Sequence, residues 1–121
     1  MKEQLISFET ALLAEKKGFD KRVENCYGKA TEILYSKMTH TNCKNDEFNV
    51  HVSAPTQSLL QKWLREEHDI QIIIGSDYKY YDFGISLEKG FNGINHKNYK
   101  YTTYELALET CLFKALNMIT L

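Results

Sequence analysis

Residues that could bind a metal ion gather in the first half of this 121-residue chain. A tetrahedral zinc site uses sulfur and nitrogen ligands, and the chain offers Cys26, His40, Cys43 and His51. Zinc ligands usually come as close pairs on tight turns, and His40 with Cys43 is the single such pair. The spacing therefore favours a solvated loop with incidental polar residues over a zinc site.

Carboxylate chemistry has one candidate group. A metal-dependent nuclease uses clustered carboxylates at strand ends with a nearby lysine, and Asp82, Glu88 and Lys89 approximate that arrangement only loosely. The sequence contains neither a G-x-S-x-G turn nor a phosphate-binding glycine pattern, which argues against hydrolases and nucleotide hydrolysis. We expect no catalytic residue, no metal and no cofactor, and we keep a small metal-dependent nuclease as a third possibility.

Tyrosine and lysine residues crowd the second half of the chain. A surface rich in tyrosine with a few cations suits either protein recognition or base stacking on a single strand. The plainer interpretation is that Tyr81 belongs to the core and the other tyrosines are ordinary strand residues. We define the tyrosine–lysine strip, the predicted binding site, as Lys79, Tyr80, Lys97, Tyr99 and Lys100.

Charge and cysteine content narrow the functional classes. The net charge is −1 and the charged residues are interspersed, so the chain lacks the basic tail typical of general nucleic-acid binding. Three cysteines cannot all pair within one chain, which fits the reducing cytoplasm. The longest apolar run, residues 72–74, is far below the roughly 20 residues that cross a bilayer, so we expect no membrane segment.

The first half of the chain predicts one helix and two strands. Ser7 can cap a helix that Gly18 ends in a left-handed conformation. A strand follows in residues 32–36, and the polar run 37–47 predicts a loop. Residues 48–53 alternate between apolar and polar, which predicts a strand with Phe48, Val50 and Val52 on its buried face.

The second half predicts a helix over residues 54–66, with Pro55 in its first turn, Leu60 and Trp63 inward and Gln57 outward. Residues 70–74 predict a buried strand, residues 75–77 a turn and residues 81–87 an alternating strand. Turn residues fill 90–95, and an edge strand starts at Tyr99.

The last helix has a well-defined start and an unusually wide apolar surface. Thr102 and Glu105 stand at capping-box spacing. Leu106 and Phe113 extend the apolar surface beyond a normal stripe, so the helix is either deeply buried or shared with a partner. We lean toward a homodimer through this helix.

Together these elements predict an α+β fold in a single domain, 1–121, with an antiparallel sheet of about five strands packed by three helices in the order α-β-β-α-β-β-β-α. From Pro55 to Met118 the order α-β-β-β-α is that of a double-stranded-RNA-binding domain. That family binds RNA phosphates through a basic cluster at the start of its last helix. Here Glu105 and Glu109 stand in that region, which argues against the same activity.

Three blocks of the sequence, SFETALLAEKKGFD, PTQSLLQKWLRE and TYELALETCLFKAL, resemble a family of small uncharacterised proteins encoded by phages and prophages of Bacteroidetes. The resemblance implies a phage or mobile-element origin and a role in the cytoplasm of a bacterial host, but no reaction. We therefore predict a non-enzymatic accessory protein that binds a host protein or ribonucleoprotein. The most specific form of this hypothesis is inhibition of host defence, such as an anti-CRISPR role. The alternative is a module that binds RNA or single-stranded DNA.

Overall fold

The computed structural model describes residues 3–36, 50–77, 79–87 and 95–120, and for residues 95–99 it describes the backbone alone. The chain divides into two compact units, residues 1–56 and residues 57–120. The single domain over 1–121 stays a prediction. The loop predicted over residues 37–47 and most of the turn predicted at 90–95 lie outside the described residues.

The first unit contains one helix and a small antiparallel sheet with the strand order β2-β1-β3. Its helix follows the prediction, because the Ser7 side chain accepts a hydrogen bond from the Thr10 amide and Gly18 has a φ of 99°. After Gly18 the Phe19 side chain is buried and its amide donates to the Ala14 carbonyl over 2.9 Å. The elements are α1 (Phe8–Lys16), β1 (Cys26–Gly28), β2 (Leu34–Tyr35) and β3 (His51–Ser53).

Long-range hydrogen bonds hold the first unit together where its strands are too short to do so. The Tyr27 hydroxyl donates to the Ile6 carbonyl over 2.6 Å, and the Ile6 amide donates to the Pro55 carbonyl over 3.0 Å. Lys29 and Glu15 form an ion pair at 2.8 Å, with both side chains mostly buried. These contacts tie residues far apart in sequence to the strands of this unit.

The strand predictions for the first unit were right in part. Strand β1 falls in residues 20–29, whose mixed pattern predicted no strand. It forms there because β2 and β3 pair with it on its two sides. Strand β3 buries Val52 as expected. The prediction that Val50 is buried was wrong, since this side chain is 47% exposed and precedes the first paired residue of β3.

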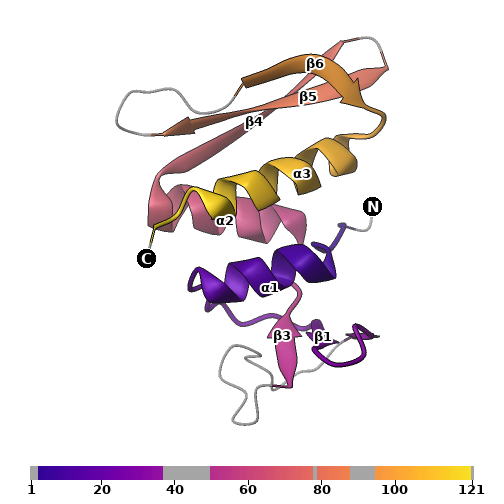
Figure 1. The fold of residues 1–121 in the computed structure, drawn as a ribbon, viewed down its shortest axis with the longest axis vertical. Coiled ribbons are helices and arrows are strands. Elements are labelled where there is room, and N and C mark those ends of the chain that lie inside the picture. Colours follow the sequence, from indigo (N-terminus) through magenta and orange to yellow (C-terminus); the bar gives the residue numbers. More distant parts are fainter. Residues whose placement is uncertain (1–2, 37–49, 78, 88–94, 121) are drawn as a thin grey trace. The chain divides into compact units, whose positions relative to one another are not determined.

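The second unit packs two helices against one face of a three-stranded antiparallel sheet (Figure 1). Its order, α-β-β-β-α, is the one expected from the sequence, with β6 at a sheet edge. Helix α3 supplies much of the core, including Leu108, Leu112 and Leu116. The elements are α2 (Gln57–His68), β4 (Ile70–Asp77), β5 (Tyr80–Leu87), β6 (Asn95–Tyr101) and α3 (Tyr104–Asn117).

Helix α2 begins three residues later than the start predicted at residue 54. Pro55 therefore lies before the helix and not in its first turn. Gln57 was predicted to face solvent but is 4% exposed, because its side-chain amide donates to the Glu105 carbonyl and to Glu109 Oε1, both over 3.0 Å. This amide joins the start of α2 to α3, an arrangement that a helical period alone does not predict.

The cap of α3 lies one residue beyond the predicted one. The Thr103 hydroxyl accepts a hydrogen bond from the Leu106 amide over 3.0 Å, so Thr103 and not Thr102 is the N-cap. Strand β6 runs to Tyr101, and residue 102 is needed for the chain to change direction before the helix begins. The capping residue is thus set by where β6 ends.

Strand β4 was predicted to end at residue 74, with a turn over 75–77, and this prediction was wrong. Asp77 pairs with Tyr80 across the hairpin, so residues 75–77 continue the strand. The expectation that residues 70–74 are buried throughout was also wrong, since Ile73 is 62% exposed. Because the helices cover one face of the sheet, residues 70–73 of β4 alternate between buried and exposed.

The α+β class and the approximate element order are confirmed. The described residues form six strands in two sheets of three, in place of one sheet of about five. The strand that the prediction omitted is β1. Among the helices within the described residues, none combines the length and the apolar content that crossing a bilayer would require.

Candidate functional site

The tyrosine–lysine strip divides between the β4–β5 turn and strand β6. Lys79 lies in the turn, Tyr80 begins β5, and both side chains are exposed. Lys100 is exposed near the end of β6. Lys97 and Tyr99 belong to β6, and their side chains lie outside the described residues.

We call the surface of the β4-β5-β6 sheet opposite α2 and α3 the open face. Tyr81 and Phe83 point to the helices, since Tyr81 contacts Tyr104 of α3 and Phe83 lies near Lys114. Side chains alternate along a strand, so their neighbour Tyr80 points to the open face. Its cross-strand partner Asp77 shares that face and is exposed too.

The centre of the open face is apolar and thinly covered. Ile73 pairs with Gly84, which has no side chain to shield it, and Ile73 remains 62% exposed. Towards the hairpin turn, Gly75 pairs with Asp82, and beyond that pair Tyr80 is 41% exposed. The open face therefore offers a partner an exposed isoleucine and an exposed tyrosine, a combination that the sequence pattern did not indicate because it predicted Ile73 to be buried.

An irregular segment of β6, a bulge of several residues, lies opposite Asp82 of the central strand. Tyr81 pairs with Tyr101 and Phe83 pairs with His96, so residues 97–100 stand opposite Asp82 alone. Three members of the strip therefore come from this bulge. Since bulges change the direction of side chains and interrupt strand pairing, this part of β6 is irregular in a way that no sequence pattern indicated.

Asp82, the central residue of the nuclease hypothesis, is 4% exposed. Its Oδ1 accepts a hydrogen bond from the Phe83 amide over 2.8 Å, and its Oδ2 has no partner among the described residues. Glu88 and Lys89 lie outside those residues. The hydrogen bond to Phe83 gives Asp82 a role in shaping the backbone at the bulge.

Two aromatic pairs involve strand β5, and one of them connects the sheet to the first turn of α3. Tyr81 meets Tyr104 edge to face, with the ring centroids 6.2 Å apart, and Phe83 lies 5.9 Å from Tyr101. The Lys114 ammonium lies 6.0 Å from the centroid of Phe83. Tyr81 was predicted to be a core residue, and its ring is half-buried in this cluster. Aromatic pairs of this kind add roughly 0.5–1.5 kcal/mol each beyond the area they bury.

Within the described residues, Cys26 and Cys111 are buried thiols outside any disulfide. Burial raises the pKa of the Cys111 thiol to about 12, although the nearby Lys114 lowers it somewhat. Because the thiolate is the reactive form, Cys111 is a poor nucleophile at neutral pH. Its Sγ lies 4.0 Å from the Gly84 carbonyl oxygen, which places it in the packing between α3 and β5.

Of the four residues considered for zinc, the structure describes Cys26 and His51. Cys26 is completely buried in β1, and His51 of β3 packs edge to face on Tyr35 at 5.7 Å. His40 and Cys43 lie outside the described residues. Among the residues that the structure does describe, no three His, Cys, Asp or Glu side chains are grouped as a metal site would require.

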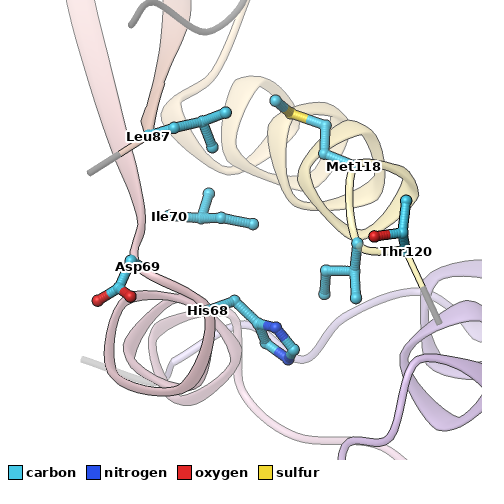
Figure 2. Close-up of a pocket in the computed structure, with 7 residues that line it drawn as sticks. His68, Asp69, Ile70, Leu87, Met118 and Thr120 are labelled. Atoms are coloured by element: carbon cyan, nitrogen blue, oxygen red, sulfur yellow. The ribbon is translucent and has the colours of Figure 1, made fainter. Parts of the chain in front are cut away.

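A pocket of about 340 Å³ lies in the second unit at the end of the sheet farthest from the β4–β5 turn (Figure 2). Ile70 and Ile119 are the most buried of its residues. The His68 ring packs edge to face on Trp63 at 4.7 Å, while the Asp69 carboxylate points away from the other lining side chains (Figure 2). The described residues that line it are His68, Asp69, Ile70, Leu87, Met118, Ile119 and Thr120.

The described part of the molecule thus offers two features for function: an exposed sheet face beside the tyrosine–lysine strip, and a mostly apolar pocket at the opposite end of the same sheet.

Comparison with protein-family models, with curated proteins and with solved structures finds no match to this chain.

Proposed function

We propose that this protein is a non-enzymatic binding protein that acts by occupying a surface of another macromolecule through its open face. The main support is the exposure of Ile73 and Tyr80, at 62% and 41%, on one face of a regular sheet. Covering apolar surface stabilises a complex by roughly 25 cal/mol per Å², before the costs of association. Tyrosine is moreover a residue type enriched in the buried centre of protein interfaces.

The preferred partner is a host protein or ribonucleoprotein in the cytoplasm of an infected or lysogenic bacterium. The phage or mobile-element origin rests on the three sequence blocks alone, and inhibition of host defence, such as an anti-CRISPR role, follows from that origin. The charge of the open face supports a protein over bare nucleic acid. Asp77 is exposed beside Tyr80, where its carboxylate would repel phosphate.

Site-specific photo-crosslinking in host lysate tests this proposal. A crosslinking amino acid at position 73 or 80 should capture one defined host protein, whereas the same group at Tyr35, which is also 41% exposed but lies in β2, should not. Replacing Tyr80 by alanine should then prevent capture from position 73. Equal capture from all three positions, or a pull-down that returns no partner, would count against the open face.

Two cation–ring contacts favour a nucleic-acid-binding module as the second candidate. Lys79 Nζ lies 5.9 Å from the centroid of Tyr80, and Lys100 Nζ lies 5.4 Å from that of Tyr101. Such pairs can stack a base and contact its phosphate. If this function holds, affinity for single-stranded RNA or DNA should fall steeply with salt, and Lys79→Gln and Tyr99→Ala should both weaken it. Salt-independent or absent binding would exclude it.

Homodimerisation through α3 is a separate part of the proposal. Leu106 and Phe113 are 49% and 39% exposed, and their spacing of seven places them on one side of the helix. Light scattering during size-exclusion chromatography should give the mass of a dimer, and Phe113→Ser should give that of a monomer. Ile33→Ser changes an apolar side chain of the first unit that is 53% exposed; it is the control and should leave the mass unchanged. A monomer at all concentrations would refute this interface.

A further inference from the structure

The pocket at the end of the β4-β5-β6 sheet has the structure of a small-molecule site. Ile70 and Leu87 are cross-strand partners, so they point to the same face of the sheet, and they close the pocket on that side. The ends of α2 and α3 supply its other walls (Figure 2). A volume of about 340 Å³ with mainly apolar walls and few polar groups is typical of pockets that bind a compact organic molecule.

The polar groups at the pocket define the hydrogen bonding that a ligand could make. The His68 side chain extends from the end of α2 toward the side that Thr120 lines (Figure 2). A neutral imidazole can accept a hydrogen bond through one nitrogen, and the threonine hydroxyl can also accept one. Both groups stand at the edge of apolar walls, so they can orient a ligand whose body lies on Ile70 and Ile119.

The electrostatics of the pocket disfavour an anion. Helix α2 ends at His68 and α3 ends at Asn117, so the negative ends of two helix dipoles meet the pocket. The Asp69 carboxylate at the rim adds a full negative charge. Arg65 and Lys114 lie in the last turns of the two helices, but Arg65 is exposed and Lys114 lies over the ring of Phe83.

We propose that this pocket binds a compact, uncharged and mostly apolar molecule that carries one O–H or N–H donor. The donor bonds to the His68 imidazole or the Thr120 hydroxyl, and the apolar body covers Ile70, Leu87 and Ile119. The site is independent of the open face, because the Ile70–Leu87 pair and the Asp77–Tyr80 pair stand at opposite ends of the hairpin. A span of seven residues in a strand separates the two by roughly 23 Å.

Cyclohexanol and cyclohexanecarboxylate form a matched pair of probes, with the same ring and either a neutral donor or an anionic head. The methyl NMR signals of Leu87, Met118 and Ile119 report directly on the walls. The emission of Trp63, the single tryptophan of the chain, reports through its contact with His68. Cyclohexanol should shift these signals saturably, and the carboxylate should bind roughly threefold weaker or worse.

Variants separate binding in the pocket from contact elsewhere. Leu87→Phe fills the pocket and should abolish the cyclohexanol response, whereas Ile73→Phe, the same enlargement on the open face, should leave it intact. His68→Leu should lower the affinity roughly two- to tenfold through the loss of one hydrogen bond, and His68→Gln, which retains an acceptor, should restore part of it.

Melting curves from circular dichroism confirm that each variant is folded before binding is measured. No saturable response to cyclohexanol in the folded wild-type chain would overturn the site. Binding that survives Leu87→Phe would show that the ligand lies elsewhere. Equal or tighter binding of the carboxylate would overturn the assignment of an uncharged donor.

Discussion

On the face of the β4-β5-β6 sheet that α2 and α3 cover, Ile72, Phe83 and Ile85 are at most 8% exposed. On the open face of the same strands, Ile73 is 62% and Tyr80 is 41% exposed. Residues one position apart in one strand thus have opposite surroundings. We infer that the covered face carries the stability of this unit and that the open face is available for binding, so substitutions should affect either stability or binding according to face.

The largest expected contrast compares two aromatic residues of β5. Phe83→Ala should lower the free energy of unfolding by roughly 3–5 kcal/mol, because it opens a cavity beneath α3. Tyr80→Ala, three residues away on the open face, should lower it by about 1 kcal/mol or less. Chemical denaturation of both variants measures the two values. Similar losses would show that the open face also contributes to the core.

Alkaline pH should destabilise the covered face through Cys111. The thiol has a pKa of about 12 in the fold against an ordinary value of 9.0, so the unfolded chain loses this proton first as the pH rises. Stability from the neutral thiol is complete below pH 9.0 and is lost between pH 9.0 and about 12, by at most roughly 1.4 kcal/mol per pH unit.

The Cys111→Ala variant isolates this contribution from the other groups that titrate at high pH. Wild type and variant should differ by a constant amount of unfolding free energy below pH 9.0, and the difference should shrink as the pH rises above it. Parallel profiles across the whole range would mean that the thiol ionises equally in the folded and unfolded chains.

The helix that covers the sheet depends on the Thr103 cap. Thr103→Ala should cost about 1 kcal/mol of stability, because the Leu106 amide loses the hydroxyl oxygen that accepts its hydrogen bond. Thr102→Ala is the matched control, as it alters the neighbouring threonine that the sequence pattern indicated as the cap. Its thermal unfolding should stay close to that of the wild type. A larger loss from the control would return the cap to residue 102.

The smallest effect on stability is expected at the centre of the open face. Ile73→Thr keeps a β-branched residue in the strand and should change the unfolding free energy by less than about 0.5 kcal/mol. Capture of a partner through a crosslinker at position 80 should nevertheless be lost. A stability loss as large as that of Phe83→Ala would show that Ile73 is buried in solution.

Local signals predicted much of the fold. The Ser7 cap, the Gly18 terminator and the strand over residues 81–87 were all correct, because each depends on residues close together in sequence. Errors arose where pairing or packing with another segment decided the outcome. Residues 75–77 are a strand because residues 80–82 pair with them, and Gln57 is buried because α3 offers it two acceptors.

The candidate sites were less predictable than the fold. The sequence identified Lys79, Tyr80 and Lys100 as surface residues, and all three are exposed. It did not identify Ile73, because an isoleucine in an apolar run is buried in most sheets. The pocket gave no signal at all, since its walls come from the ends of four separate elements.

By itself, then, the sequence determined the α+β class, the approximate element order and both ends of the first helix. Only the tertiary structure decided which face of each strand is covered, where the β6 bulge falls and which ends of helices and strands enclose the pocket. The physical reason is range: capping and side-chain alternation act between near neighbours, whereas burial and strand pairing depend on segments that meet only after the chain has folded.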